Sequence, residues 1–370
     1  MSLVNSYYLK NLLSLLPGGY CFAFAYGSAV FKQSVSSLGV VGHSVNSTTS
    51  PSRLIKPINK LTSWFSSSPS SSEEQVKMID MIVVVDDSLK FHENNLSTNQ
   101  NHYSILKRFG AKVITNIQDN FGASIYFNTL IPIKDDNGAE CLLKYGIINR
   151  KNLINDLYDW DHLYTSGRLH KPVKIIHSPS DDGSISKALT INHQNALYSA
   201  LLLLSETFTE EQLFITIANL SYDGDFRMTF GEDRNKVAKI VKPNIEKFKS
   251  IYQPYIGSSI EKGLLSFNSN QRIYFQDLSP RVICHNLSLL PKRVQQNLYF
   301  NYESRGKLRD LDDVLMAIAQ SYKYSDDVRQ AIRQIVRKSS WTQSAKGVFT
   351  AGLIKSMKYS TRKLIKMSKS

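Results

Sequence analysis

Cysteine is scarce in this sequence, and long apolar runs are missing from it. The three cysteines, Cys21, Cys141 and Cys284, are far apart and odd in number. This pattern fits neither a disulfide framework nor a zinc site, so we expect free thiols in a reducing compartment. No uncharged run approaches the ~20 apolar residues that a membrane-spanning helix needs. Any contact with a membrane should therefore be peripheral.

Acidic residues are absent from both ends of the chain. The first is Glu73 and the last is Asp327, and the 370 residues carry a formal net charge of +14. Such a charge favours an anionic partner, which is a nucleotide, a nucleic acid or an acidic membrane surface. The length predicts roughly two to three domains. An apolar content of 42% is enough to build their hydrophobic cores.

Two short apolar stretches carry the residues of a candidate phosphate-binding site. Residues 22–26 predict a strand that ends at Gly27-Ser28, and residues 78–85 predict a buried strand that contains one carboxylate, Asp80. Gly27 would let the backbone approach a triphosphate, and the Ser28 hydroxyl would add a hydrogen-bond donor. Asp80 would hold Mg²⁺, which prefers carboxylate, phosphate and water oxygens. Taken alone, either feature is more often an ordinary turn or cap.

Seven motifs follow one another in a defined order along the chain. They are Tyr26-Gly-Ser-Ala-Val-Phe31, Ile79-Asp80 with Asp86-Asp87, Asn101-His-Tyr-Ser104, Lys144-Tyr-Gly146, Gly167-Arg-Leu169 with Lys171-Pro-Val173, Leu220-Ser-Tyr222 with Gly224-Asp-Phe-Arg-Met228, and Val241-Lys-Pro-Asn244. In this order they resemble the mitochondrial translocator assembly and maintenance family, whose members are phosphatidate cytidylyltransferases, also called mitochondrial CDP-diacylglycerol synthases. The resemblance extends from about residue 10 to the expected C-terminal helix.

The patterns and the resemblance together predict the fold class. We expect an α/β (α+β) nucleotidyltransferase-type domain with a mixed sheet, then a mainly helical, winged-helix-like domain and a C-terminal amphipathic helix. The first domain should span residues 1–205, with a disordered Ser-rich insertion at about 34–74. The second should span 206–335, and 336–370 would form the C-terminal segment.

Local patterns predict two further features of these domains. Residues 121–133 and 141–148 predict a hairpin, because Asn137-Gly138 ends a turn between two alternating apolar runs. Thr209 precedes an acid-rich stretch and should cap a helix.

Residues 2–16 predict a helix that ends at Pro17. We expect mainly a core helix and not a cleaved presequence, because transit peptides are usually rich in arginine and this stretch is not. Import would then use an uncleaved or internal signal. The expected apolar stripe consists of Leu3, Val4, Tyr7, Tyr8, Leu12, Leu15 and Leu16.

A second carboxylate is missing where nucleotidyltransferases commonly place one, two residues after the first and on the same face of the strand. Ile82 occupies that position. Asp86 and Asp87 lie ~20 Å further along an extended strand, too far to share an ion with Asp80, and their roles stay open. Asp225 is our candidate for the second metal ligand, although an Asp-Gly turn would also explain it.

Several cations would neutralise the phosphates. Lys144 lies in a predicted strand, and Arg168 and Lys171 flank a glycine motif. Arginine can bind phosphate oxygens bidentately, whereas lysine acts as a point charge. Arg227 would add a phosphate contact beside Asp225. Ordinary surface charge is the equal alternative for Lys144, Arg168 and Lys171.

The resemblance also assigns substrate binding to Tyr26 and to the motif that holds His102, Tyr103 and Ser104. These side chains would donate hydrogen bonds to the base, the ribose or the phosphates. Capping and packing of a helix is the equal alternative for His102 and Tyr103.

The end of the chain predicts an amphipathic helix from residue 350 that contains no acidic residue. Its apolar face consists of Leu353, Ile354, Met357, Thr361, Leu364 and Ile365, and lysines and arginines occupy the rest. This pattern favours a helix that lies in an anionic membrane interface over a helix packed in a core.

The resemblance implies a Mg²⁺-dependent enzyme, with Mn²⁺ or Co²⁺ as possible substitutes, that transfers the cytidylyl group of CTP to phosphatidate. The products would be CDP-diacylglycerol and pyrophosphate, for cardiolipin and phosphatidylglycerol synthesis. It would act as a peripheral protein on the matrix side of the mitochondrial inner membrane. Asp80, Asp225 and Lys144 would carry the catalysis.

Two alternatives stay open. One is a nucleotidyltransferase that acts on RNA ends, which the positive charge suits equally. The other is a non-enzymatic assembly factor for inner-membrane translocases. The amphipathic end favours a lipid, so we expect no nucleic-acid partner. The oligomeric state, the acyl-chain preference and the residues that read cytosine are not predicted.

Overall fold

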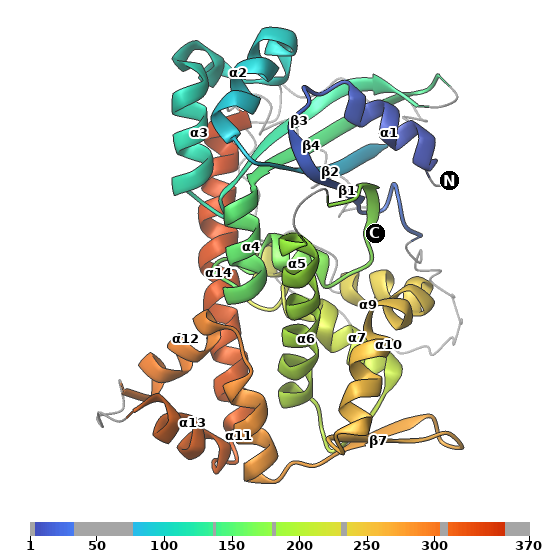
Figure 1. Cartoon of the computed structure of the whole chain (residues 1–370), viewed down its shortest axis with the longest axis vertical. Coiled ribbons are helices and arrows are strands. Elements are labelled where there is room, and N and C mark those ends of the chain that lie inside the picture. Colours follow the sequence, from blue (N-terminus) through green and yellow to red (C-terminus); the bar gives the residue numbers. More distant parts are fainter. Residues whose placement is uncertain are drawn as a thin grey trace, which may run out of the picture.

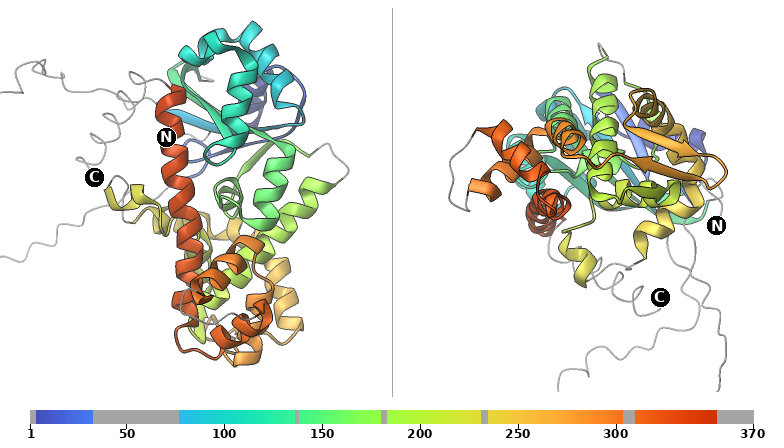
Figure 2. Two further views of the ribbon diagram at one scale, coloured as in Figure 1. Left: turned by 90° about the vertical axis from the view of Figure 1, so that its left-hand side faces the viewer. Right: turned by 90° about the horizontal axis from the view of Figure 1, so that it is seen from below.

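The computed structural model describes residues 4–32, 77–135, 138–179, 183–230, 235–303 and 310–351. The predicted Ser-rich insertion lies outside these residues, and so does nearly all of the predicted amphipathic end. A part that contains a sheet forms one end of the molecule and a mainly helical part forms the other (Figure 1). The long helix α14 (Tyr324–Ala351) runs beside both parts (Figure 2).

A five-stranded mixed sheet organises the first part, in the order β3-β4-β2-β1-β5. Its strands are β1 (Tyr20–Tyr26), β2 (Met78–Val85), β3 (Ile125–Lys134), β4 (Glu140–Asn149) and β5 (Lys174–His177). β2 and β4 are parallel, and the other neighbours are antiparallel. The predicted hairpin is confirmed as β3 and β4. The mixed sheet with helices agrees with the predicted α/β class.

Helices cover both faces of this sheet, which explains why β1 and β2 are apolar on both sides. One face packs against α1 (Ser6–Ser14), α2 (Ser88–Thr98) and α3 (Gly110–Asn120), with the 3₁₀ turns η1 (Gln100–His102) and η2 (Ile105–Phe109). The other packs against α4 (Arg150–Asp159), α5 (Thr165–Leu169) and α6 (Ser184–Leu203). We call these the α2–α3 face and the α4–α6 face. Side chains alternate between the faces along each strand.

The helical part has its own apolar core and a small sheet in the order β6-β8-β7. Its elements are β6 (Thr207–Thr209), α7 (Glu210–Asn219), α8 (Phe226–Phe230), α9 (Lys236–Val241), η3 (Lys242–Asn244), α10 (Ile245–Glu261), β7 (Leu265–Asn268), β8 (Ile273–Gln276), α11 (Pro280–Ser288), α12 (Lys292–Glu303), α13 (Leu311–Ala319) and α14. The core also includes Trp160, Leu163 and buried residues of α6. The winged-helix description and the domain boundaries stay predictions.

Two local predictions can be compared directly with the helices. Thr209 caps α7: its hydroxyl accepts a hydrogen bond from the Gln212 N–H, and the Gln212 side chain accepts one from the Thr209 N–H. α1 is a core helix, and its apolar stripe agrees only in part with the expected one. Tyr7 and Leu15 are 72% and 55% exposed. Leu12 and Leu16 of the expected stripe are buried, and so are Leu9 and Leu13, which the stripe did not include. Within the described ranges, no helix combines the length and apolarity needed to cross a bilayer.

Candidate functional site

The end of β1 and the start of β2 adjoin one another. Tyr26 pairs with Asp80 in the antiparallel register, and the chain then turns at Gly27 with a φ of +88°. A Cβ atom built on Gly27 would lie 3.4 Å from Asp80 Oδ2. L side chains rarely adopt this φ, so glycine allows the turn to run directly beside the carboxylate. Ser28 follows and is exposed.

Lys144 lies on the other side of Asp80. The two residues are partners in the parallel register of β2 and β4, and Lys144 Nζ is 3.4 Å from Asp80 Oδ1. The ammonium group also lies 4.5 Å from the centroid of the Phe127 ring. Both charged side chains are about one-fifth exposed, so solvent and a ligand can reach the pair.

Arg168 adds a second cation from α5. Its guanidinium carbon lies 4.3 Å from the centroid of the Tyr26 ring, a cation–π distance. Burial raises the pKa of Tyr26 far above its usual value, so the phenol stays protonated. Tyr26, Gly27, Asp80, Lys144 and Arg168 therefore come together on the α4–α6 face.

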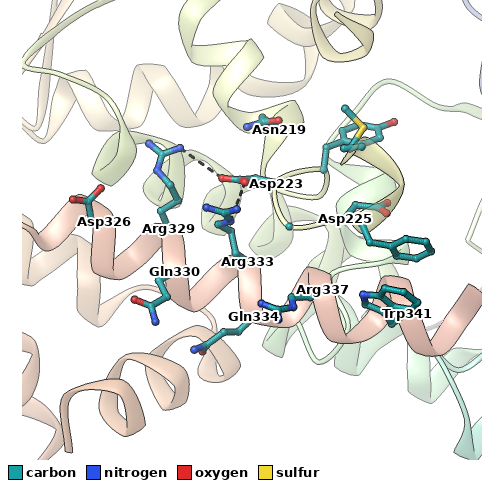
Figure 3. Close-up of a pocket in the computed structure, with 14 residues that line it drawn as sticks. Asn219, Asp223, Asp225, Asp326, Arg329, Gln330, Arg333, Gln334, Arg337 and Trp341 are labelled. Carbon is teal, nitrogen blue, oxygen red and sulfur yellow. Dashed lines mark ion pairs between the residues drawn. The ribbon is translucent and has the colours of Figure 1, made fainter. Parts of the chain in front are cut away.

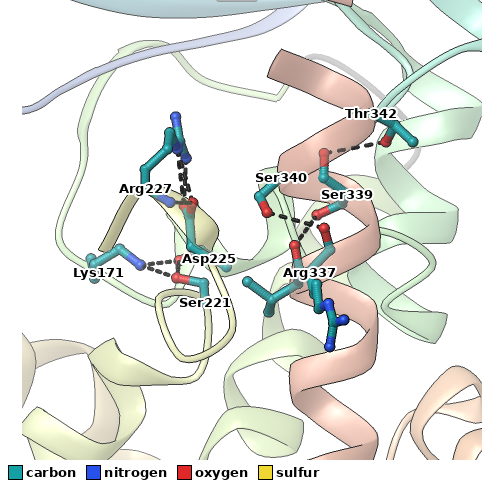
Figure 4. A network of polar contacts seen from close by, with 10 residues as sticks. Lys171, Ser221, Asp225, Arg227, Arg337, Ser339, Ser340 and Thr342 are labelled. Atoms are coloured by element: carbon teal, nitrogen blue, oxygen red, sulfur yellow. Dashed lines mark hydrogen bonds and ion pairs between the residues drawn. The ribbon is translucent and has the colours of Figure 1, made fainter. Parts of the chain in front are cut away.

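Lys171 is a buried cation next to this group. Its ammonium donates hydrogen bonds to the Gly167 carbonyl and to Ser221 Oγ, the latter at 2.7 Å (Figure 4). Burial lowers the pKa of Lys171 well below its usual value, and the charges of Arg168 and Lys236 lower it further. Among the residues that the structure describes, no carboxylate contributes to this shift. A bound anion would raise the pKa of Lys171 again, because a nearby negative charge favours the charged form of the lysine.

Tyr222 joins Lys171 to the next basic residue along the site. Its ring centroid lies 5.0 Å from Lys171 Nζ and 5.5 Å from Lys236 Nζ. No role was predicted for Tyr222, although it lies within one of the seven motifs.

Further lysines gather beyond the Gly27 turn. Lys247 Nζ lies 4.3 Å from the centroid of the Phe31 ring. Burial lowers the pKa of Lys247, and the charges of Lys174 and Lys32 add to the shift. The Asn244 side chain donates a hydrogen bond of 2.9 Å to the Lys32 carbonyl and so ties α10 to the chain after β1.

Asp225 is buried and bound by Arg227. The guanidinium donates to both carboxylate oxygens, at 2.6 Å from Nη2 to Oδ2 and 3.0 Å from Nε to Oδ1 (Figure 4). None of the described contacts joins Asp225 to Asp80, and the described ranges contain no group of three or more His, Cys, Asp or Glu side chains suited to a metal. The metal-ligand role of Asp225 and the phosphate contact of Arg227 stay predictions without support from this geometry.

His102 and Tyr103 lie on the α2–α3 face, opposite Asp80. Tyr145 follows Lys144 in β4, so its side chain points to that face, where its hydroxyl lies 2.9 Å from His102 Nδ1. The Tyr103 hydroxyl lies 2.8 Å from His92 Nδ1 inside the same core. Burial lowers the pKa of His92 to about 4, so the His92 ring is neutral at physiological pH.

Ser104 has no described contact with the Gly27 turn either. It is the N-cap residue of η2, although its side chain makes no capping hydrogen bond. The structure therefore does not bring Ser104, His102 or Tyr103 together with Asp80, because the sheet lies between the two sets.

Asp86 and Asp87, whose roles the sequence left open, serve the local structure at the far end of β2. Asp86 forms an ion pair of 2.5 Å with Arg150 at the start of α4. Asp87 is the N-cap of α2 and accepts a hydrogen bond of 3.0 Å from the Lys90 N–H.

A cavity of about 770 Å³ lies between the loop at residues 219–228 and α14 (Figure 3). Asp223 forms ion pairs there with Arg333 and Arg329, at 3.2 and 3.6 Å. Gly224, at a φ of +98°, lies against the backbone of Arg333, where a Cβ atom would be only 2.7 Å from the carbonyl oxygen. Tyr222 borders this cavity as well as Lys171, so α14 supports the loop that carries part of the candidate site.

Comparison with known proteins gives a consistent result. The family described as mitochondrial phosphatidate cytidylyltransferase matches residues 9–366. Relatives of that name include a Xenopus laevis protein, 39% identical over 99% of this chain and 96% of its own, and a Danio rerio protein, 38% identical over 98% and 95%. A Drosophila melanogaster protein of the same name is 36% identical over 96% of this chain and 97% of its own. The resemblance of the seven motifs is thus confirmed, and the chain belongs to the mitochondrial phosphatidate cytidylyltransferase family.

Proposed function

We propose that this protein transfers the cytidylyl group of CTP to phosphatidate, which forms CDP-diacylglycerol and releases pyrophosphate. Membership of the family supports the reaction. The observation that supports its location is the turn at Gly27 beside Asp80, with Lys144 and Arg168 on the same face of the sheet. A backbone turn, one carboxylate and several cations form a suitable set for a nucleoside triphosphate and its divalent ion.

The backbone at Gly27 and Ser28 would bind the phosphates. Its amides lie after the last residue of a strand, and glycine removes the side chain that would block a close approach. Lys144 is paired with Asp80 in the structure. A bound triphosphate would compete for the Lys144 ammonium and release the Asp80 carboxylate for a cation.

Asp80 fits a Mg²⁺ ion that is held mainly by substrate and water oxygens. Mg²⁺ commonly binds through one or two carboxylates plus phosphates and keeps several waters. When bound, it would neutralise negative charge on the phosphates. Mn²⁺ and Co²⁺ accept similar oxygen ligands and would be substitutes.

The nucleophile needs little activation. The phosphate oxygen of phosphatidate is already anionic, so no strong general base is required for attack on the α-phosphorus of CTP. The work of the chain is to position the two substrates and to stabilise the charge that spreads over the phosphates. Arg168 and the buried Lys171 would supply this stabilisation from the α5 side of the site.

We further propose that the protein acts peripherally on the matrix side of the mitochondrial inner membrane, within cardiolipin and phosphatidylglycerol synthesis. The mitochondrial names of its relatives and the basic, acid-free end of its sequence support this location. The expected substrate, phosphatidate, is itself an anionic membrane lipid.

The substitution Asp80→Asn tests the proposed reaction. We expect it to lower the formation of CDP-diacylglycerol from CTP, phosphatidate and Mg²⁺ by at least ~100-fold, since an electrostatic group at a phosphoryl site contributes about this much. Asp86→Asn is the matched control, because it removes another paired carboxylate from the other end of β2. Undiminished activity in Asp80→Asn would remove this residue from the site. Incorporation of CTP into RNA ends, in place of lipid, would favour the alternative enzyme.

A further inference from the structure

Apolar side chains are exposed on η2 and the first turn of α3. Ile105 is 59% exposed, Phe109 63% and Val113 40%, whereas their neighbours Leu106 and Ile114 pack against the core. Three large apolar side chains exposed within nine consecutive residues form a patch, and patches of this kind mark interaction surfaces more often than isolated apolar residues do.

Cations are interleaved with these apolar residues. Lys107, Arg108 and Lys112 lie in the same nine residues, and Arg108 and Lys112 are exposed. No acidic residue occurs between Glu93 and Asp119. We call the six residues Ile105, Lys107, Arg108, Phe109, Lys112 and Val113 the 105–113 patch.

The site described above does not use this patch. η2 and α3 cover the α2–α3 face of the sheet, whereas Asp80 and Lys144 lie on the α4–α6 face. The helices α2 and α3 form the end of the molecule opposite β7 (Figure 1). A partner on the patch would therefore leave the Gly27 turn open.

The end of α14 is fixed to the same helix as the patch. Lys346 Nζ donates hydrogen bonds to the carbonyls of Gln118 and Phe121, at 2.9 and 2.6 Å, where α3 ends. α3 has 11 residues, so it is about 16 Å long. This contact lies at the end of α3 away from Val113, so it joins α14 to the helix that carries part of the patch.

We propose that the 105–113 patch is a docking surface for an anionic lipid bilayer. Apolar side chains would enter the interface while the adjacent cations pair with lipid phosphates, the arrangement of interfacial membrane-binding segments. The uniform positive charge favours a bilayer over an ordinary protein partner, whose surface would carry both signs. The patch would thereby fix the orientation of the protein on the membrane.

Sedimentation of the full-length protein with phosphatidylcholine vesicles that contain phosphatidate tests the apolar half of the patch. We expect Phe109→Ser to weaken binding about tenfold, because it removes most of one large interfacial side chain. Phe300→Ser is the matched control: Phe300 is 62% exposed and lies on α12, outside the patch. Thermal unfolding of both variants checks that each is folded.

The cationic half has its own test. Replacing Lys107, Arg108 and Lys112 by glutamine should weaken binding about fivefold per cation removed. Replacing Lys187, Lys262 and Lys292, which are exposed elsewhere, removes the same net charge and should have a much smaller effect. Wild-type binding should weaken as salt is raised and should be weak to vesicles of phosphatidylcholine alone.

Several results would overturn the proposal. Equal binding by the Phe109 and Phe300 variants would exclude the patch as a membrane contact. Cross-linking of residues 352–370 to the patch without vesicles would show that this segment, and not a bilayer, covers it. A change in self-association with unchanged vesicle binding would assign the patch to a second copy of the chain. Vesicle binding is measured without CTP, so its outcome is independent of the proposed reaction.

Discussion

Gly27 occupies a backbone conformation that few other residues adopt, directly beside the Asp80 carboxylate. Its role combines two physical requirements. The φ of +88° excludes most side chains on steric grounds, and the close approach to Asp80 leaves little room above the carboxylate. Asp80 and Lys144 form an ion pair. This pair holds the carboxylate where a divalent cation would bind and the ammonium group where a phosphate would bind.

The substitution Gly27→Ala tests both requirements, the positive φ and the close approach to Asp80, with one measurement for each. We expect a loss of about 1 to 2 kcal/mol in the free energy of unfolding from the left-handed backbone. We also expect a loss of activity of ~100-fold or more, because the new methyl group would stand between the phosphates and Asp80. Denaturant unfolding and the CDP-diacylglycerol assay measure the two effects.

Gly263→Ala is the control for backbone strain. Gly263 has a φ of +71° after α10, and no atom lies within 4 Å of a Cβ built there. It should lose similar stability and keep its activity. If both variants lost activity equally, the effect at Gly27 would come from stability and not from the site.

At the scale of single elements, α14 connects the helical part to the sheet. Its side chains bind the loop that holds Asp223 and Gly224, and further along they reach the end of α3. Lys346 is buried at that second contact, and burial lowers its pKa to about 7. The nearby carboxylate of Asp119 raises the pKa only in part.

This buried lysine should make the stability of the protein depend on pH. Between about pH 7 and the usual lysine pKa near 10.4, the unfolded chain holds a proton that the folded chain lacks. The free energy of unfolding therefore rises with pH across this window, where the unfolded state binds more protons. Urea unfolding of the wild type and of Lys346→Met at pH 7 and pH 9 checks this. The wild type should gain stability relative to the variant at the higher pH, and a difference independent of pH would contradict the assignment.

Several elements could be predicted from the sequence because local signals determine them. Apolar runs predicted β1 and β2, a turn sequence predicted the β3–β4 hairpin, and Thr209 predicted the start of α7. The buried face of α1 could be predicted only in part, because apolar residues occur around much of that helix and the position of the sheet decides which of them pack.

The sequence predicted which strands carry Asp80 and Lys144, but not which residues of neighbouring strands lie side by side. Asp80, Lys144 and the Gly27 turn adjoin because of strand register, which the sequence alone does not fix. Tyr145 follows Lys144 in β4, so its side chain points to the other face of the sheet. That His102 lies on that face as well could be known only from the positions of the helices that cover it. The pairing of Asp225 with Arg227, two residues away, is a local contact that competes with the predicted metal role.

At the scale of the whole molecule, two groups of cations in the described ranges have different uses. One group of cations, which includes Arg168, Lys171 and Lys236, gathers near the Gly27 turn, between the sheet and the helical part. A second group lies on the 105–113 patch, on the opposite face of the sheet. An enzyme that takes a nucleotide from solution and a lipid from a membrane requires both an anion site and an anionic surface contact.

The most direct test of the central claim is anomalous scattering from Mn²⁺ in crystals grown with CTP. We predict a peak at a bonding distance of about 2 Å from the Asp80 carboxylate, with the triphosphate along the backbone of Gly27 and Ser28. A metal peak at Asp225, or a nucleotide bound beside His102 on the other face of the sheet, would contradict the proposed site.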